Sequence, residues 1–324
     1  MSTIVFISDE FAPEHIHFFS SKLGEKFEIH HYNKAVSLKD QIVNANVVIS
    51  YGKDLTGDIL SAAKDLKMVI RLGTAKGNLD TDYLDSKSIA HFNTQSPALI
   101  SVAEHTMALI LALSKEIIFS DKSVRSNLNP KGYSESKTDQ LHYAYNWLDL
   151  NRFDCLYKKT LGIVGFGIVG QRLARIGNAM DMYVMYYSRN RLSDKREKEL
   201  HVRYGSFDDV LSQSDFVSSH LILNSETLGL FNKDAFSKMK KTAYFINTSR
   251  GAVVCEKDLI EALEKGMIAG AGLDVFEVEP LPANSPLKKM QNVVLTAHSA
   301  GIQLYKSLYT EFEDGAFIIK ENLH

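Results

Sequence analysis

Three residues toward the C-terminal end have side chains that together suit carbonyl chemistry: Arg250, Glu279 and His298, each shortly after an apolar run. A guanidinium can bind a carboxylate with two hydrogen bonds and polarise a carbonyl. An imidazole titrates near neutral pH and can donate a proton, and a nearby carboxylate favours its protonated form. Reduction of a 2-oxo acid needs these three roles. Each residue alone is equally well explained as a loop ion pair, a surface acid or a packed histidine. The three residues indicate a catalytic site only in combination, because each follows a predicted strand and all of them come after the glycine-rich segment described next.

A glycine-rich segment follows the apolar run Leu161–Val164 and opens a segment with helical periodicity. It consists of Gly165, Phe166, Gly167, Ile168, Val169 and Gly170. In this arrangement the first glycine permits a tight turn and the second lets the backbone approach a pyrophosphate. The third lets helix and strand pack closely, and the helix N-terminus faces the phosphates. A tight turn without a ligand is the alternative. The strand before and the helix after favour a dinucleotide site.

The end of the next predicted strand bears on which dinucleotide binds. An acidic residue about 20 positions after the glycines normally accepts the 2′-hydroxyl of NAD. Here the segment Tyr186–Arg191 has no carboxylate and carries Ser188 and Arg189 instead. A hydroxyl can hydrogen-bond a 2′-phosphate, and a guanidinium can form a charge-assisted fork to it. We therefore expect NADP(H) to be preferred over NAD(H). The alternative is a solvated basic loop.

The elements that must position these residues alternate between short apolar runs and segments of helical period, which predicts parallel sheets with crossover helices. The predicted strands are Ile4–Ile7, Val47–Ser50, Met68–Arg71, Leu161–Val164, Tyr183–Tyr187, Phe216–His220, Ala243–Ile246, Ala269–Leu273 and Val293–Leu295. Six of them follow from Leu161 onward, as in a complete dinucleotide-binding fold. Ligands bind beyond the carboxyl ends of parallel strands, so we expect the three catalytic candidates to converge there.

Composition limits the class of protein. A 324-residue chain with 45% hydrophobic residues suits two packed domains. A formal net charge of −2 does not favour nucleic acid or a membrane surface as partner. Cys155 and Cys255 form neither a disulfide framework nor a metal-ligand pattern, so no metal is expected. The N-terminus lacks a signal-peptide pattern, and the longest apolar stretch, Ala108–Leu113, is too short to span a bilayer. We expect a cytoplasmic location.

The chain resembles the D-isomer-specific 2-hydroxyacid dehydrogenases over nearly its whole length. Besides the glycine motif, the matching segments are RLGTAKGNLD at 71–80, VAEHTMALIL at 102–111, INTSRGAVV at 246–254, AGLDVFEVEPLP at 271–282 and LTAHSAG at 295–301. The resemblance implies two Rossmann-like or flavodoxin-like domains with doubly wound parallel sheets. A cofactor domain, 100–298, would be inserted into a substrate domain formed by 1–99 and 299–324. The resemblance also implies a homodimer built through the cofactor domains.

The same resemblance implies roles for individual residues. Arg250, Glu279 and His298 would be the catalytic set, Asp274 would lie near the nicotinamide and Thr248 near the cofactor. The backbone that would bind the substrate carboxylate is Gly73, Thr74, Ala75 and Lys76.

Three positions depart from the family pattern. Ala297 stands where a proline usually precedes the histidine. Ser188 replaces the usual acid, as in the family's NADP-using glyoxylate and hydroxypyruvate reductases. Lys76 is charged in a loop that is usually small or apolar. It either points into solvent or offers a second positive charge to a more anionic substrate.

Together these features predict an NADPH-preferring oxidoreductase that reduces a small 2-oxo acid, of the glyoxylate or hydroxypyruvate kind, to the D-2-hydroxy acid. A 3-phosphoglycerate dehydrogenase and a phosphite-type dehydrogenase, the latter raised by Lys76, are alternatives. The non-enzymatic alternative is a dinucleotide-sensing corepressor.

Residues 126–158 differ from the rest of the chain, because they are polar, aromatic and irregular in pattern. Tyr143, Tyr145 and Trp147 cluster there. Such a composition is typical of interfaces. We expect an arm at a dimer interface or over the mouth of the active site. The competing interpretation is a loop folded on its own domain.

Overall fold

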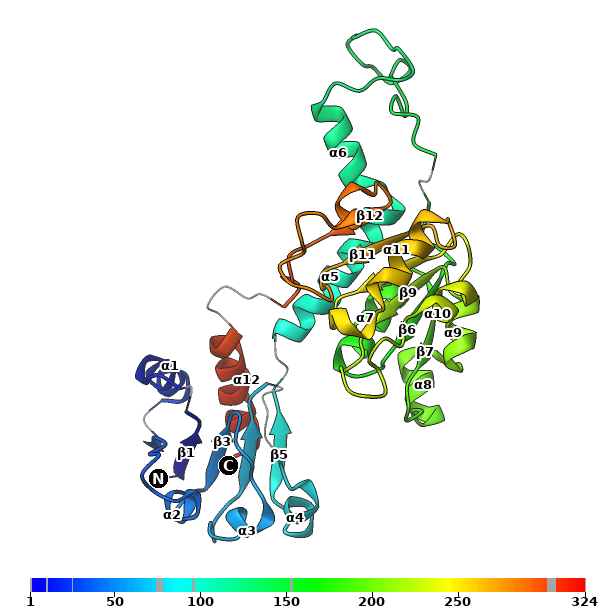
Figure 1. The fold of residues 1–324 in the computed structure, drawn as a ribbon. Helices are drawn as coiled ribbons and strands as arrows, with labels where there is room; N and C mark the ends of the chain where they lie inside the picture. The colour runs from blue at the N-terminus through cyan, green and yellow to red at the C-terminus, as the bar shows by residue number, and fades with distance from the viewer. Residues whose placement is uncertain are drawn as a thin grey trace. The chain divides into compact units, whose positions relative to one another are not determined.

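The computed structural model describes residues 2–9, 11–24, 26–73, 78–94, 97–151, 154–301 and 307–323. The chain divides into two compact units, one formed by Met1–Leu99 with Gln303–His324 and the other by Ile100–Ile302. Each unit is a parallel sheet with flanking helices (Figure 1). The predicted α/β fold with parallel sheets is therefore confirmed.

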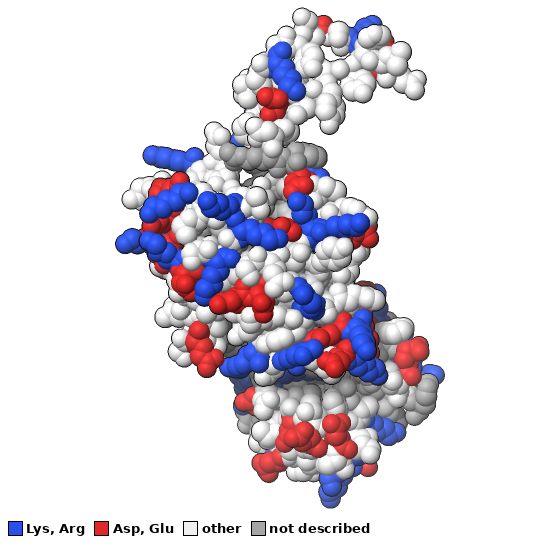
Figure 2. Space-filling model, turned by 90° about the vertical axis from the view of Figure 1, so that its right-hand side faces the viewer, with Lys and Arg blue, Asp and Glu red and all other residues white. Residues whose placement is uncertain are grey.

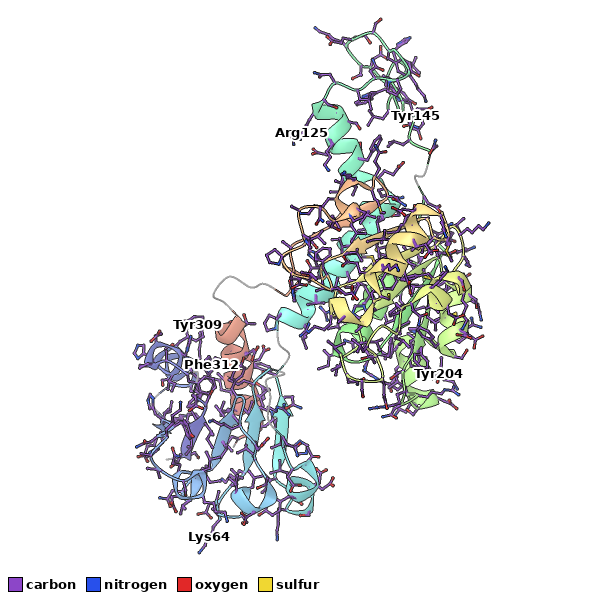
Figure 3. The ribbon with its side chains drawn as sticks, in the orientation of Figure 1. Lys64, Arg125, Tyr145, Tyr204, Tyr309 and Phe312 are labelled. Atoms are coloured by element: carbon purple, nitrogen blue, oxygen red, sulfur yellow. The ribbon has the colours of Figure 1, made fainter. Side chains whose placement is uncertain are left out.

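The first unit contains five parallel strands in the order β2-β1-β3-β4-β5. They are β1 (Ser2–Ile7), β2 (Phe27–His30), β3 (Val47–Ser50), β4 (Met68–Arg71) and β5 (Ala90–Asn93). The helices are α1 (Pro13–Leu23), α2 (Leu38–Ile42), α3 (Gly57–Leu60), α4 (Thr81–Ser86) and α12 (Ser307–Asn322). Strand β3 is buried at every residue, as expected for a central strand covered on both faces. The rings of Phe6, Phe19 and Phe312 meet edge to face and pack β1 against α1 and α12. Figure 3 labels Phe312 on α12.

The second unit contains seven parallel strands in the order β12-β11-β10-β9-β6-β7-β8. They are β6 (Thr160–Val164), β7 (Tyr183–Tyr187), β8 (Arg203–Tyr204), β9 (Phe216–Ser219), β10 (Tyr244–Asn247), β11 (Gly270–Leu273) and β12 (Val293–Leu295). The α-helices are α5 (Pro97–Ser114), α6 (Ile117–Arg125), α7 (Ile168–Ala179), α8 (Asp194–Leu200), α9 (Phe207–Gln213), α10 (Lys233–Lys238) and α11 (Glu256–Glu264). Two short 3₁₀ helices are η1 (Gly251–Val253) and η2 (Pro286–Lys289).

Six neighbouring strands of this sheet end level with one another. Register partners form one row across the sheet, which runs through Tyr187, Val164, Ser219, Asn247, Leu273 and Leu295. The residues that follow the row lie along a single edge of the sheet, because the strands are parallel. The strand order reverses at β6, with β7 and β8 on one side and β9 to β12 on the other. Ligands of doubly wound sheets bind at such a point.

All nine predicted strands are present, and the described residues include three further strands that were not predicted. The unpredicted ones are β2, β5 and β8. Each lies at an edge of its sheet. Their sequences, FEIH, AHFN and RY, lack the continuous apolar run that indicates a buried strand.

Helix α5 and the segment after it differ in burial. Among the described residues, α5 is the helix that is long and apolar enough to cross a membrane by length and composition alone. Its residues Ala103, Leu109 and Ile110 are buried in the core of the second unit. Helix α6 and the irregular residues 126–151, which include Tyr145, extend away from that core (Figures 1 and 3).

Basic and acidic side chains are mixed over the face of the molecule shown in Figure 2. This distribution is in keeping with the formal net charge of −2.

Candidate active site

The imidazole of His298, after β12, contacts the carboxylate of Glu279, after β11. Nδ1 of His298 lies 2.7 Å from Oε2 of Glu279, and Oε1 accepts a hydrogen bond of 3.0 Å from the N–H of Phe276. Burial raises the pKa of Glu279, but the hydrogen bonds from His298 and Phe276 outweigh burial and hold this pKa below its ordinary value. Glu279 is therefore ionised at neutral pH. Since Nδ1 is bound to Glu279, Nε2 is the nitrogen of His298 that can serve a substrate.

Gly251 brings the loop of Arg250 against the loop that leads to Glu279. A Cβ built on Gly251 would lie 1.8 Å from the carbonyl oxygen of Phe276, so a side chain at this position would collide with backbone. The two loops can approach this closely only with glycine. The sheet register and Gly251 thus bring the ends of β10 and β11 together.

The loop that carries Arg250 is shaped by Asn247, the last residue of β10. Asn247 is buried, its Nδ2 donates to the carbonyl oxygen of Arg250 at 3.0 Å, and its Oδ1 accepts from the N–H of Ser249 at 3.0 Å. The Arg250 side chain is exposed, and its Nη1 donates to the carbonyl oxygen of Ser249 at 2.6 Å. This guanidinium contacts a neutral backbone acceptor and has further donors for an anionic ligand.

Glu279 and His298 open onto a largely apolar groove of about 510 Å³. It is lined by Phe276, Glu279, Pro280, Leu281, Lys288, Leu295, Thr296, Ala297 and His298. Enzyme sites typically combine apolar walls with a few placed polar groups. The hydrogen-bonded pair of His298 and Glu279 faces such a groove.

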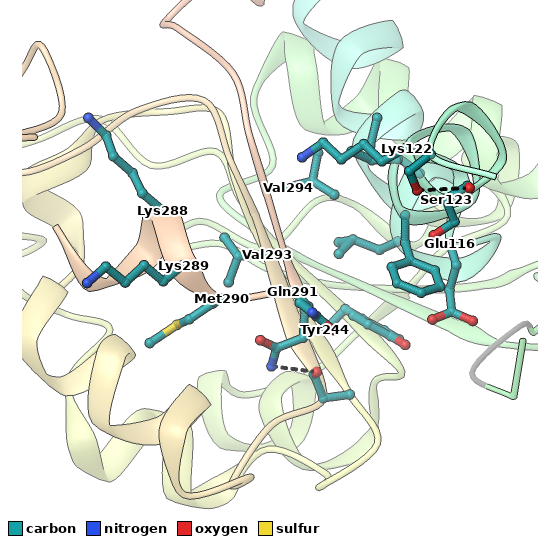
Figure 4. A pocket seen from close by; sticks show the side chains of 17 residues that line it. Glu116, Lys122, Ser123, Tyr244, Lys288, Lys289, Met290, Gln291, Val293 and Val294 are labelled. Carbon is teal, nitrogen blue, oxygen red and sulfur yellow. Dashed lines mark hydrogen bonds between the residues drawn. The ribbon is translucent and has the colours of Figure 1, made fainter. Parts of the chain in front are cut away.

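A second hollow in this unit, of about 360 Å³, lies between α5, α6 and the η2–β12 segment (Figure 4). Glu116, Lys122, Ser123 and Tyr244 contribute to its lining. None of the three catalytic candidates lines it. We assign the site to the groove at His298, because the acid–base pair lies there.

The glycine segment after β6 has the geometry of a phosphate-binding turn. Gly165 has a φ of +92°, and a Cβ on it would lie 2.6 Å from the carbonyl oxygen of His220. A Cβ on Gly170 would lie 2.6 Å from the carbonyl oxygen of Gly165, so this glycine serves close packing. A Cβ on Gly167, the N-cap of α7, would meet nothing within 4 Å. The open space at Gly167 fits a ligand that approaches the backbone at the helix N-terminus.

Ser188 and Arg189 follow β7 at the same edge of the sheet. Ser188 is half-buried and Arg189 is exposed. Nη1 of Arg189 donates to Oε2 of Glu226 at 3.1 Å. Glu226 lies in the segment after β9, so this ion pair joins the loops that follow the two neighbours of β6. The bridge therefore connects the loops on both sides of the strand that carries the glycine turn.

Arg191 is bound within the protein, by a carboxylate that the local sequence did not suggest. Its Nε and Nη2 donate to Glu197 at 2.8 and 2.9 Å, and Nη2 also donates to Asp194 at 3.1 Å. The hydroxyl of Tyr186 donates to Glu197 at 2.7 Å, and burial raises the pKa of Tyr186 to about 12. The Arg191 guanidinium lowers the pKa of Glu197. Arg189 is thus the arginine of this loop with the more exposed side chain.

Three of the other predicted cofactor residues, Phe166, Thr248 and Asp274, are buried, whereas Ile168 is exposed and Val169 is half-buried. Thr248 bonds Thr106 of α5 through hydroxyls 2.9 Å apart. Asp274 is fully buried and contacts protein groups of the His298 loop. Their proposed contacts with the cofactor stay predictions.

Of the predicted substrate loop, Gly73 lies in the first unit. It has a φ of +59°, and its N–H donates to Oγ1 of Thr94 at 2.9 Å. Thr74, Ala75 and Lys76 lie outside the described residues, so their role stays a prediction. Among the residues that the structure describes, no cluster of three metal-ligating side chains occurs.

Sequence reasoning missed the partners of the candidate residues. Phe276 contributes a backbone N–H, a group that every non-proline residue carries. Glu226 lies 37 residues from Arg189. Asp274 is bound by the hydroxyl of Thr296, which in turn contacts His105, 191 residues away from Thr296. Thr296 alone had a local signal, because it stands two residues before His298.

Comparison with known proteins gives a consistent result. Residues 107–300 match the family model of the D-isomer specific 2-hydroxyacid dehydrogenase, NAD binding domain. The chain is 33% identical over 286 residues to a glyoxylate reductase of Korarchaeum cryptofilum, covering 86% of this chain and 82% of that protein. It is 39% identical over 241 residues to a glyoxylate reductase of Pyrococcus furiosus, covering 74% and 68%.

A solved structure of D-lactate dehydrogenase from Aquifex aeolicus, complexed with NAD and lactic acid, also matches. It has a TM-score of 0.56 and 27% identity over 98% of this chain and 94% of that one. The chain therefore belongs to the D-isomer-specific 2-hydroxyacid dehydrogenases, and it is an oxidoreductase with a nicotinamide dinucleotide as cofactor.

Proposed function

We propose that this protein is an NADPH-preferring reductase of a small 2-oxo acid, with a substrate of the glyoxylate or hydroxypyruvate kind. The observation that carries the proposal is the 2.7 Å contact between His298 and Glu279, at the sheet edge that also carries the glycine turn. The names of the Korarchaeum and Pyrococcus relatives support the substrate class.

His298, Arg250 and Glu279 each have one role in the proposed reaction. A reduced nicotinamide, when bound, supplies the hydride that C2 of the substrate accepts. Nε2 of His298 donates the proton to the carbonyl oxygen, so the substrate gains one hydride and one proton and becomes the 2-hydroxy acid. Arg250 binds the carboxylate and polarises the carbonyl. Glu279 stabilises the imidazolium form that reduction requires.

The cofactor preference is proposed from Ser188 and Arg189. A 2′-phosphate would accept hydrogen bonds from the hydroxyl and the guanidinium, whereas a carboxylate at this position would repel it. Fluorescence titration should give a lower dissociation constant for NADPH than for NADH. The variant Ser188→Asp should reverse that order. Equal affinities in the unmodified protein would refute the preference.

The substrate class is tested by NADPH oxidation with glyoxylate, hydroxypyruvate, pyruvate, phenylpyruvate and 2-oxoisocaproate. We expect glyoxylate and hydroxypyruvate to give the highest kcat/KM. Binding of NADPH without turnover of any 2-oxo acid would favour a dinucleotide sensor. Oxidation of 3-phosphoglycerate or phosphite in the absence of 2-oxo acid reduction would favour the corresponding dehydrogenase.

We also propose that the protein is a cytoplasmic homodimer, with α6 and residues 126–151 as the interface arm. Exposed apolar side chains on this arm support the proposal: Ile117, Val124, Leu128, Tyr133, Leu141, Tyr143, Tyr145 and Trp147. Stable interfaces bury aromatic side chains at their centre. Light scattering should give a dimer mass, and the double variant Tyr143→Ser, Tyr145→Ser should weaken it. A monomer in the unmodified protein would refute the arm's role, and cell fractionation tests the location.

A further inference from the structure

We propose that Asp274 is a positioning residue that holds the loop of His298 in its working conformation. The inference rests on the proposed role of His298 as proton donor. It goes beyond a contact between Asp274 and the cofactor, because it assigns the carboxylate a partner within the protein.

Asp274 contacts almost every residue of the loop that carries the histidine. Its carboxylate is fully buried and accepts four hydrogen bonds. The donors are Oγ1 of Thr296 at 2.5 Å, the N–H and Oγ of Ser299 at 2.9 and 3.5 Å, and the N–H of Ala300 at 2.9 Å. The carbonyl oxygen of Asp274 accepts a further bond of 2.7 Å, from the N–H of His298 itself. One residue at the end of β11 thus fixes the backbone on both sides of the imidazole.

The loop needs such fixing because His298 has an unfavourable backbone conformation. Its φ is +51°, in the left-handed region that non-glycine residues rarely adopt. Such a residue keeps this conformation only when its surroundings determine it strongly. The side chain is 49% exposed, so packing of the imidazole contributes little. The restraint on the backbone comes from the hydrogen bonds to Asp274, and the contact of Nδ1 with Glu279 holds the imidazole.

A third residue extends this network into helix α5. Nε2 of His105 lies 2.9 Å from Oγ1 of Thr296, whose single proton is given to Asp274. Oγ1 can then only accept from His105, so Nε2 of His105 carries a proton. The chain of donors runs from His105 to Thr296 to Asp274. It orients the Thr296 hydroxyl toward the carboxylate and leaves that carboxylate engaged on both oxygens.

The test compares three variants in the full-length protein. Thr296→Val removes the hydroxyl donor, and Thr296→Ser keeps it. Asp274→Asn has a single side-chain oxygen, so it can accept from only one of the N–H groups of Ser299 and Ala300. Measurements are kcat and KM with a 2-oxo acid, and the dissociation constant of NADPH by fluorescence. Ser101→Ala is the matched control, because the Ser101 hydroxyl donates to the carbonyl of Ala300 at 2.8 Å without contacting Asp274.

We expect Thr296→Val to lower kcat by roughly tenfold, since a small misplacement of a catalytic group can cost up to about 100-fold. Asp274→Asn should lower kcat further. The NADPH dissociation constant of Thr296→Val should change less than about twofold, which is within the usual error of such differences. Thr296→Ser should recover most of the loss, and Ser101→Ala should change kcat little. Unchanged kcat in Thr296→Val would overturn the proposal, as would an equal loss in Ser101→Ala.

A second readout does not depend on turnover. The proton between Nδ1 of His298 and Glu279 should give a downfield NMR resonance, assigned by its absence in His298→Ala. We expect Thr296→Val and Asp274→Asn to broaden or remove this resonance, and Ser101→Ala to keep it. If Asp274→Asn keeps the resonance and weakens NADPH binding, then Asp274 acts on the cofactor. If the resonance behaves as expected but no 2-oxo acid is reduced, the proposed function fails while the positioning role of Asp274 stands.

Discussion

Replacing Glu279 with glutamine should move the pH dependence of reduction to lower pH. The reductive rate requires protonated His298, so it falls when pH rises and the imidazolium loses its proton. The Glu279 carboxylate stabilises that imidazolium across a 2.7 Å contact. Without its charge the proton is lost at lower pH. Oxidation of the 2-hydroxy acid requires the neutral imidazole, and its rising limb should therefore move to lower pH as well.

The strength of the interaction that this substitution removes follows from the geometry. Two unit charges about 4 Å apart interact by about 1 kcal/mol in water and by about 4 kcal/mol at an effective dielectric constant of about 20. The His298 and Glu279 side chains are 49% and 34% exposed, which places the pair between these limits. A tenfold change in rate corresponds to about 1.4 kcal/mol. We therefore expect the reductive kcat/KM at mildly basic pH to fall by roughly tenfold.

The assay is kcat/KM for NADPH oxidation, measured from mildly acidic to mildly basic pH with the best substrate of the panel. Glu277→Gln is the matched control, because Glu277 is an exposed acid of the same loop and its charge is screened by solvent. Its pH profile should overlay that of the unmodified enzyme. If the profile of Glu279→Gln also overlays it, Glu279 does not stabilise the imidazolium and the assigned mechanism is wrong.

Three further predictions concern other residues. Glu226→Gln removes the carboxylate that engages Arg189, so NADPH should bind up to about fivefold more tightly, the limit for an exposed ion pair, with NADH unaffected; equal gains would contradict this. Arg250→Lys keeps the charge but loses the two-pronged contact, so KM should rise and kcat should fall; a change in KM alone would contradict a role in polarisation. Burial lowers the pKa of His220 from 6.5 to about 4, so the folded state should lose stability as pH falls from 6.5 toward 4. His220→Gln should flatten that fall in thermal melts, and an identical slope would contradict it.

The limits of sequence reasoning about the fold are visible in the strands. Buried parallel strands such as VVIS at β3 are covered on both faces, so they form continuous apolar runs that can be recognised without a structure. The edge strands β2, β5 and β8 pair on one side only and tolerate exposed polar residues. Their sequences carry no such run, and they become strands because a neighbour offers hydrogen-bonding groups. The strand conformation of β2, β5 and β8 therefore depends on their neighbours in the folded sheet and not on their own sequences.

In the candidate site, too, some residues could be predicted from the sequence and others could not. The side-chain types of Arg250, Glu279 and His298 could be interpreted because each has a distinctive chemistry. The supports of these residues could not be found, because they are backbone groups or lie far away in sequence. The N–H of Phe276 and the Asp274 network have no pattern in side-chain spacing. The positive φ of His298 likewise depends on hydrogen bonds that only the folded loop reveals.

The wide separation of Ser188 and His298 along the sheet edge implies that cofactor choice and proton transfer are energetically independent. Ser188 follows β7 and His298 follows β12, which are five strand positions apart in the sheet. At about 4.8 Å per strand the two ends are separated by roughly 24 Å. Substitutions more than about 10 Å apart with no shared partner usually add within about 0.5 kcal/mol.

The double variant Ser188→Asp, Glu279→Gln tests this independence. With NADH as cofactor, the Glu279→Gln change should shift the pH profile of kcat/KM by the same amount in both backgrounds. The preference for NADH over NADPH that Ser188→Asp creates should likewise be unchanged by Glu279→Gln. A coupling well above about 0.5 kcal/mol would mean that the two ends of the sheet share a partner.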